Sequence, residues 1–305
     1  MTAAIHSRPA GTGAASQARG DAKSAPRIDF AEPKGEPALA APDSVSWRVF
    51  KNPISLYIGG ITAVLLELAE PRVRTGVWDH TSFRTDPLPR LKRTGFAAMV
   101  TVYGPRSVAE RMIAGVGRMH GRVKGVTPAG EPYRATDPAL LDWVQATASF
   151  GFMEAYHAFV HPLTPGERDR FYAESAPAAR LYGAVGAPAS EAELNAHFQA
   201  MRPRLERSPI LFEFIGIMRR TPALPAPLRP LQGMLIRAAI ELVPAWARGI
   251  LGLDARYGLK RWEAPLVRFA GRVADRIVLK SAPPAQACAR MGLPASYLYR
   301  GAWHK

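Results

Sequence analysis

Apolar residues recur every three to four positions along most of the chain from Ile54 onward, which is the spacing of amphipathic and buried helices. The run from Ile54 to Leu66 is apolar almost throughout and continues into Glu67 and Glu70. A bilayer span needs roughly 20 such residues, so this run predicts a buried core helix. No sustained alternation of β-branched residues appears, and the pattern therefore predicts an all-α fold.

Helix start signals divide the pattern into elements. Ser107, Thr164 and Ser190 each precede a glutamate by three positions, the arrangement of a capping box. Asp137 precedes Pro138, which predicts an N-cap followed by proline at the first helical position. The predicted helices cover residues 107–123, 138–160, 164–182 and 190–201.

The ends of the chain differ from its middle in composition. Residues 1–45 are rich in Ala, Gly, Pro and Ser and lack the apolar core of a signal peptide, so we expect a disordered leader. Residues 46–280 are expected to form a single helical domain, and 281–305 a C-terminal tail. Proline-rich stretches at 221–230 and 281–284 predict connectors.

Two amphipathic helices are predicted between these connectors, over Leu231–Leu253 and Arg261–Leu279. Either they pack back on the core, which is the commoner outcome, or they lie along a membrane surface. The net charge of +15, from 40 Lys and Arg against 25 Asp and Glu, favours anionic partners such as phospholipid headgroups. Basic residues never run to five in a row, which argues against a nucleic-acid-binding arm.

Cysteine content limits the chemistry that the chain can support. The single cysteine, Cys288, excludes an intramolecular disulfide and any zinc or iron–sulfur site built from several cysteines. It also fits a reducing compartment, so we expect a cytoplasmic protein, with peripheral membrane association as the alternative.

His120 is the most informative candidate for a ligand. It lies four residues after Val116 and seven after Ile113, on the inward face of its predicted helix. Gly115, Gly117 and Gly121 surround it, although each glycine inside a helix costs roughly 0.5–1 kcal/mol relative to alanine. Their lack of side chains would let a flat macrocycle such as a haem approach the helix. The alternative is a core histidine satisfied by protein partners.

Charged and polar residues upstream are the other candidates. Arg90, Arg93 and Thr94 share one helix face, where they either bind carboxylates and dioxygen or form a solvated surface. Glu67 and Glu70 end the apolar helix; a buried carboxylate there would have a raised pKa suited to a general base, whereas an exposed one would not.

Two further histidine motifs are weaker candidates. Asp79 and His80, in a predicted loop over 78–87, form either an acid–base pair or a cap. His157 and His161 have the spacing of a metal chelate, but no carboxylate completes the site. No P-loop, GxGxxG, GxSxG or HExxH pattern occurs in a supporting context.

Several segments in a fixed order resemble the catalytic domain shared by bacterial rubber oxygenase (latex clearing protein) and the endoplasmic-reticulum oxygenase of mycophenolic acid biosynthesis. They are GGITAVLLELAEP (59–71), VWDHTSFRTDPLPRLKRT (77–94), GRMHGRVKG (117–125), PYRATDPALLDWVQAT (132–147), LTPGERDRFYAES (163–175) and PLRPLQGMLIRAAIELVPAWARGILGL (227–253). The resemblance covers most of the chain after Phe50.

This resemblance implies a haem-b oxygenase with a globin-like bundle of helices, which uses dioxygen on a small apolar, isoprenoid or lipid-like substrate. His120 matches the proximal iron ligand, and Arg90 to Thr94 match an Arg-x-x-Lys-Thr motif with Arg93 in place of lysine. Arginine stays protonated and is a poor iron ligand, so the distal side is expected to be open or water-bound. We also expect Lys124 to contact the cofactor.

The resemblance leaves some choices open. It implies a glutamate base upstream of the motif without deciding between Glu67 and Glu70, and Gln145 stands where many relatives have histidine. Two alternatives remain: a haem protein that senses or carries, and a non-enzymatic helical module that binds lipid or a membrane surface.

Overall fold

The computed structural model describes residues 28–300, and in this range the chain is almost entirely helical. Its helices are α1 (Val45–Phe50), α2 (Pro53–Glu67), α3 (Pro71–His80), α4 (Pro87–Tyr103), α5 (Arg106–His120), α6 (Pro138–Phe159), α7 (Pro165–Tyr182), α8 (Glu191–Met201), η1 (Arg202–Arg204), α9 (Pro209–Arg220), η2 (Ala226–Leu228), α10 (Arg229–Leu242), α11 (Ala245–Leu251), α12 (Glu263–Ala274), α13 (Pro283–Arg290) and α14 (Tyr297–Arg300). The prediction of an all-α fold is confirmed; the likeness to a globin bundle stays a prediction.

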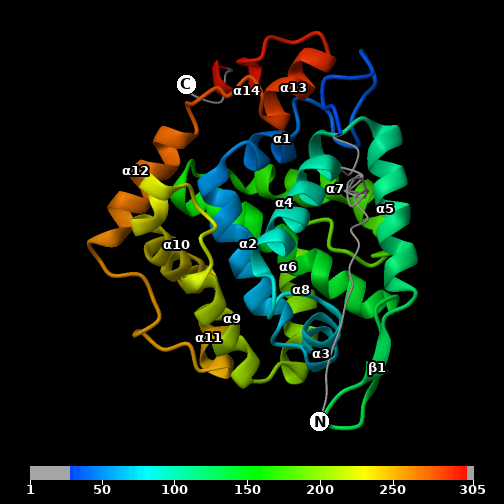
Figure 1. Cartoon of the computed structure of the whole chain (residues 1–305), viewed down its shortest axis with the longest axis vertical. Coiled ribbons are helices and arrows are strands. Elements are labelled where there is room, and N and C mark those ends of the chain that lie inside the picture. The colour runs from blue at the N-terminus through cyan, green and yellow to red at the C-terminus, as the bar shows by residue number, and fades with distance from the viewer. Residues whose placement is uncertain (1–27, 301–305) are drawn as a thin grey trace, which may run out of the picture.

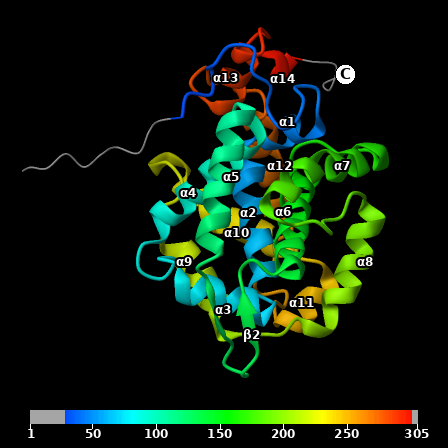
Figure 2. The ribbon, with the colours of Figure 1, turned by 90° about the vertical axis from the view of Figure 1, so that its right-hand side faces the viewer.

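A short hairpin is the one piece of β-structure in the described range. Strands β1 (Lys124–Val126) and β2 (Pro132–Arg134) pair antiparallel, with Gly125 opposite Tyr133. The hairpin extends beyond the C-terminal end of α5, at one edge of the molecule (Figures 1 and 2). Three residues per strand are too few to show a period of two, so no pattern of residues predicted the hairpin.

The most central contact of the fold is the crossing of α2 and α6 (Figure 1). Gly59 and Gly151 meet there backbone to backbone: a Cβ on Gly59 would lie 2.6 Å from the Gly151 carbonyl oxygen. Small residues at a crossing let two helix axes approach closely, which brings the flanking side chains into contact. Absence of a side chain at these two positions therefore fixes how the bundle packs.

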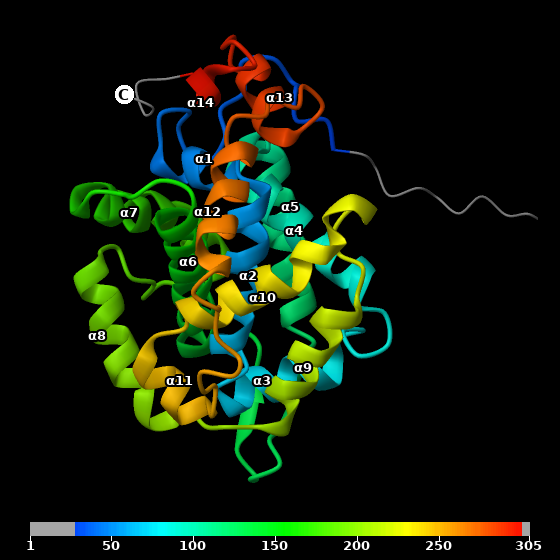
Figure 3. The same cartoon turned by 90° about the vertical axis from the view of Figure 1, so that its left-hand side faces the viewer.

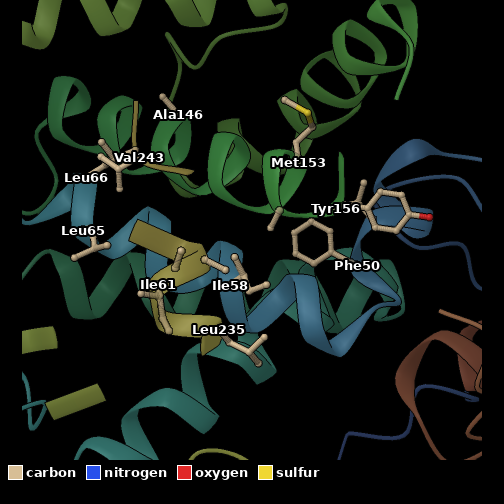
Figure 4. Packing of buried hydrophobic residues seen from close by; sticks show 14 of the residues in the cluster. Phe50, Ile58, Ile61, Leu65, Leu66, Ala146, Met153, Tyr156, Leu235 and Val243 are labelled. Atoms are coloured by element: carbon tan, nitrogen blue, oxygen red, sulfur yellow. The ribbon is translucent and has the colours of Figure 1, made fainter. Parts of the chain in front are cut away.

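Apolar side chains from both sides of this crossing form one core. Ile58, Ile61 and Leu65 of α2, Met153 of α6 and Leu235 of α10 belong to this core, which Figure 4 shows around the crossing, and all five are buried. The apolar run predicted as a buried helix is thus confirmed as the centre of the bundle.

Several helices begin at a polar N-cap followed by proline. Asn52, Asp137, Thr164 and Ser208 each accept a hydrogen bond from a backbone N–H of the first turn. Proline lacks the N–H that would be unsatisfied at that position and presets the helical φ angle. The capping box predicted at Thr164 is confirmed.

Two predictions about α5 were wrong. The box at Ser107 does not form, because α5 begins one residue earlier and the Ser107 N–H donates to the Glu36 carboxylate at 2.6 Å. The helix also ends at His120 instead of Val123, with Gly121 as its C-cap. Gly121 therefore lies just after the helix, in the right-handed conformation, and not inside it as predicted.

The chain ends contribute to the packing wherever they are described. Residues 1–27, the larger part of the expected leader, and 301–305 lie outside the described range. Phe30 and Ala38 are buried against the bundle, and the buried Arg290 of α13 donates to the carbonyl oxygens of Phe30 and Tyr103. Within residues 28–300, no helix alone has the length and apolar composition of a membrane span; α2 and α3 meet both only together, across a 113° bend.

Candidate functional site

Three of the candidate side chains come together where helices end or begin. Glu67 is the last residue of α2, Arg90 lies in the first turn of α4, and His120 is the last residue of α5. The positive charge of Arg90 acts on both partners, since it lowers the pKa of Glu67 and the pKa of His120. Because the charge of Arg90 acts on both Glu67 and His120, the three groups form one electrostatically coupled cluster.

Glu67 carries the most perturbed carboxyl group of this cluster. Burial raises its pKa to about 7, and Arg90 only partly opposes that effect. The side chain nevertheless keeps some solvent-accessible surface. Since protein surrounds this group and water still reaches it, we infer a hollow beside Glu67, and a carboxyl with a pKa near neutrality can give or take a proton there.

Glu70, the alternative base, has a structural role. Its carboxylate is fully buried and caps α3 by accepting from the Val73 N–H at 2.9 Å. It also pairs with Arg72 at 2.8 Å and lies 3.5 Å from Arg204. With these lone pairs engaged, Glu70 holds the turn between α2 and α3 and leaves Glu67 as the free carboxyl group.

His120 is held in its neutral form. Burial is the main cause that lowers its pKa, and the charge of Arg90 adds to it. The imidazole makes no hydrogen bond to any described residue. A half-buried, neutral and unpartnered imidazole has a nitrogen lone pair available for a metal ion. The alternative of a core histidine satisfied by protein partners is not what the structure shows.

The space beside these residues is only partly filled by protein. On α2, which is buried over most of its length, Tyr57, Gly60, Val64 and Glu67 form a stripe of partly exposed positions along one face. Gly60 lies against Phe152 of α6, where an added Cβ would be 3.8 Å from the ring. Phe152 is itself partly exposed, so α2 and α6 both face the hollow.

Helices α4 and α5, which cover this region, are loosely packed. Only Val100, Val102 and Tyr103 are fully buried in α4, and only Ala109 and Ile113 in α5. A Cβ built on Gly95 or on Gly117 would meet no atom within 4 Å. Both positions are exposed, and of the three glycines predicted to admit a flat group only Gly117 faces open space, since a Cβ on Gly115 or Gly121 would lie 3.6 Å or 3.5 Å from atoms of Arg118.

The remaining predicted residues lie at the margin of the cluster. Arg93 and Thr94 are exposed: Arg93 donates to Ser82, and the Thr94 hydroxyl donates to the Arg90 carbonyl oxygen at 3.0 Å. Lys124 is the first residue of β1 and is also exposed. The structure thus brings Glu67, Arg90 and His120 together and leaves these three at the surface.

The weaker histidine candidates have structural partners. His157 accepts from the Leu163 N–H at 2.9 Å, and His161 lies 3.7 Å from the Asp275 carboxylate. His80 ends α3, so the loop predicted over 78–87 begins only at Thr81, and the His80 ring is 3.2 Å from the Tyr133 hydroxyl. Across residues 28–300, no three His, Cys, Asp or Glu side chains are grouped to hold a metal ion.

Tyr57 is a candidate that the sequence reasoning missed. Its hydroxyl is buried without a hydrogen-bond partner among the described residues, and burial raises its pKa. An unpaired buried hydroxyl costs about 1–3 kcal/mol, so a bound group that accepts this hydrogen bond would recover that cost. The available signal was its spacing of ten residues from Glu67, which places both on one face of α2.

Two surface hollows lie away from the cluster. One of about 620 Å³ is bounded by α11 and residues 252–259, and one of about 350 Å³ by residues 84–88 and 217–222. Neither is lined by Glu67, Arg90 or His120. The convergence of chemical groups therefore identifies the candidate site better than the size of a hollow does.

Comparison with known families gives one match. The model described as "ER-bound oxygenase mpaB/B'/Rubber oxygenase, catalytic domain" covers residues 47–276, from α1 to just after α12. Neither the curated proteins nor the solved structures include a match to the chain. The matched range contains every residue of the cluster.

Proposed function

Because the chain belongs to the catalytic-domain family of the ER-bound oxygenase mpaB/B' and rubber oxygenase, we propose that it is a haem-b-dependent oxygenase that uses dioxygen on a small apolar substrate. The observation that carries the haem dependence is the half-buried imidazole of His120 at the end of α5, which has a lowered pKa, makes no hydrogen bond to a described residue and lies near enough to Arg90 to feel its charge.

The side chains around this hollow fit a haem. A porphyrin needs one axial nitrogen ligand, a flat space and cationic partners for its propionates. His120 offers the nitrogen, and the open space at Gly95 and Gly117 offers room for a flat group. Arg90 provides a partly buried guanidinium, with Arg93 and Lys124 at the margin. The orphaned Tyr57 hydroxyl is a further polar group that a ligand would satisfy.

The residues of this chain would have the following roles. His120 would hold the iron, and Arg90 would bind a propionate; burial, with the charge of Arg90 adding to it, lowers the pKa of the imidazole. When bound, the haem supplies the redox chemistry with dioxygen. Glu67, with a pKa of about 7, takes a proton from the substrate. Thr94 takes part only if its hydroxyl leaves the Arg90 carbonyl oxygen.

The partly exposed stripes on α2 and α6 support an apolar substrate. Val64, Ala148 and Phe152 contribute carbon atoms to this face, and Glu67 stands at its end. Apolar walls exclude water and keep the pKa of the Glu67 carboxyl raised. An isoprenoid or lipid-like molecule suits such a surface better than a charged metabolite does.

Replacement of the ligand tests this proposal. We expect His120→Ala to lower haem affinity by more than about tenfold, since no second imidazole is in the cluster, while the circular dichroism of the helices stays unchanged. The haem absorption band of protein reconstituted with hemin measures the effect. His80→Ala is the matched control, because His80 is an exposed histidine outside the cluster and should leave the spectrum unchanged.

Two results would contradict the proposal. If His120→Ala bound haem with the wild-type spectrum, the ligand assignment would be wrong. If wild-type protein failed to bind hemin at all, the proposed haem dependence would be wrong, and the chain would be a module without this cofactor.

A further inference from the structure

Helix α12 presents apolar side chains to solvent along its whole length. Trp262, Leu266, Phe269 and Val273 follow one another at spacings of four, three and four residues, so they form one ridge. Phe269 is 68% exposed and Trp262 60%. Ile277 and Leu279 continue the exposed apolar surface after the helix. We call Trp262, Leu266, Phe269 and Val273 the apolar ridge.

A row of arginines runs beside this ridge. Arg268, Arg272 and Arg276 recur every four residues on the adjoining face, and all three are exposed. Arg261 and Lys280 extend the row at its two ends. The only acidic residues between 261 and 280, Glu263 and Asp275, are buried. The outer surface of this segment is therefore apolar along one side and positively charged along the other.

The inner face of α12 is fixed to the bundle, so the ridge cannot turn inward. Glu263 pairs with Arg237 of α10 at 2.9 Å, and Asp275 pairs with the buried Lys51 at 2.9 Å. Between these anchors, Gly271 lies against the Phe159 carbonyl oxygen so closely that a Cβ would clash. Figure 3 shows α12 on the outside of the molecule, across α2 and α10.

We propose that this face of α12 binds the surface of a bilayer that contains anionic phospholipids. The apolar ridge would enter the boundary between headgroups and acyl chains, with Trp262 in the interfacial layer where tryptophan is favoured. The arginine row would contact lipid phosphates, which carry the complementary charge. The proposal does not depend on haem binding or on catalysis.

A second copy of the chain is a poorer occupant of this surface. Two such faces that meet would bring their arginine rows together, with no exposed carboxylate of α12 to neutralise them. Like charges at close range oppose association, whereas an anionic bilayer attracts the same row.

Vesicle flotation with the full chain tests the proposal. We expect binding to vesicles of phosphatidylcholine mixed with phosphatidylglycerol, weaker binding to phosphatidylcholine alone, and a decrease with added salt. Phe269→Ser should weaken binding about tenfold, because the variant loses a large apolar side chain that would be buried in the bilayer. Arg272→Gln combined with Arg276→Gln should weaken it about tenfold as well, at low salt only.

Val185→Ser is the matched control, since Val185 is 71% exposed but lies after α7, away from the ridge. Sedimentation of the same variants in the absence of lipid reports on self-association. The proposal is overturned if the wild type stays unbound to anionic vesicles, if Phe269→Ser binds as the wild type does, or if Phe269→Ser only converts a dimer into monomers. Circular dichroism confirms that each variant is folded.

Discussion

Glu67 and Glu70 are three residues apart, yet the structure gives their carboxyl groups opposite roles. The Glu70 carboxylate lies against Arg72, Arg204 and the N-terminus of α3, and so its buried charge is compensated. For Glu67, the charge of Arg90 only partly opposes the effect of burial, which raises the pKa of the carboxyl group to about 7. A buried carboxyl group without a counterion lowers the free energy of unfolding. Proteins commonly retain such a group where it has a function.

That cost can be measured through its pH dependence. Between pH 4.5 and about 7, folded Glu67 holds a proton that the unfolded chain has lost, so the free energy of unfolding falls as pH rises. The full cost, roughly 3 kcal/mol, is present above pH 7 and absent below pH 4.5. Glu67→Gln should therefore stabilise the protein at pH 8 and leave it unchanged near pH 4.5, as measured by urea unfolding.

Glu70→Gln is the control of opposite sign. It weakens the cap of α3 and both ion pairs, so we expect a loss of about 1–3 kcal/mol at pH 8. If Glu67→Gln also destabilised the protein at pH 8, Glu67 would be a structural group and not the free carboxyl of the site.

At the scale of elements, the crossing of α2 and α6 decides the geometry of the site. Contact at Gly59 and Gly151 brings the two axes close together, and the partly exposed stripes of both helices then face the same hollow. Helices α4 and α5 close this hollow with few buried side chains of their own. Elements that are loosely packed in this way are expected to be the most mobile part of the bundle.

Substitution at the crossing should separate packing from helix propensity. In Gly151→Ala the new Cβ would clash with the Gly59 carbonyl oxygen, and we expect a loss of more than about 3 kcal/mol in the free energy of unfolding. Gly60→Ala, one residue from the crossing, has only a normal contact to Phe152 at 3.8 Å. It should be neutral or stabilising by up to about 1 kcal/mol. Equal effects of the two substitutions in chemical denaturation would show that the crossing has room to relax.

At the scale of the whole molecule, segments distant in the sequence hold the bundle together. The buried Lys51, next to α1, pairs with Asp275, the residue after α12. Asn52 joins the same cluster by donating to Asp275 and to the Gly271 carbonyl oxygen. These contacts fasten α12 across the start of α2 and hold its apolar ridge outward.

Breaking this pair should cost more than removing it. Asp275→Asn leaves the Lys51 charge buried without a counterion, and we expect a loss of about 3–5 kcal/mol in the free energy of unfolding. Combination with Lys51→Met removes that charge and should restore a large part of the loss. Guanidinium unfolding of the single and double variants measures both effects; a double variant as unstable as Asp275→Asn would mean that the carboxylate acts through Asn52 alone.

The sequence by itself determined the helical fold class, the extents of α2, α6, α7 and α8 and the family, because apolar periodicity, caps and ordered motifs are local properties of the chain. The helix predicted over 231–253 is instead divided into α10 and α11, with Pro244 between them. It also identified Glu67, Arg90 and His120 as candidates. It did not reveal the β1–β2 hairpin, the early end of α5 or the orphaned Tyr57 hydroxyl.

Only the tertiary structure distinguished Glu67 from Glu70, since the difference lies in Arg204 and Arg90, which come from other elements. The same holds for α12, whose pattern fitted both a core helix and a surface helix until its anchors showed which face points outward. Periodicity records that a helix has two faces, whereas burial and charge compensation depend on what the rest of the chain places beside each face.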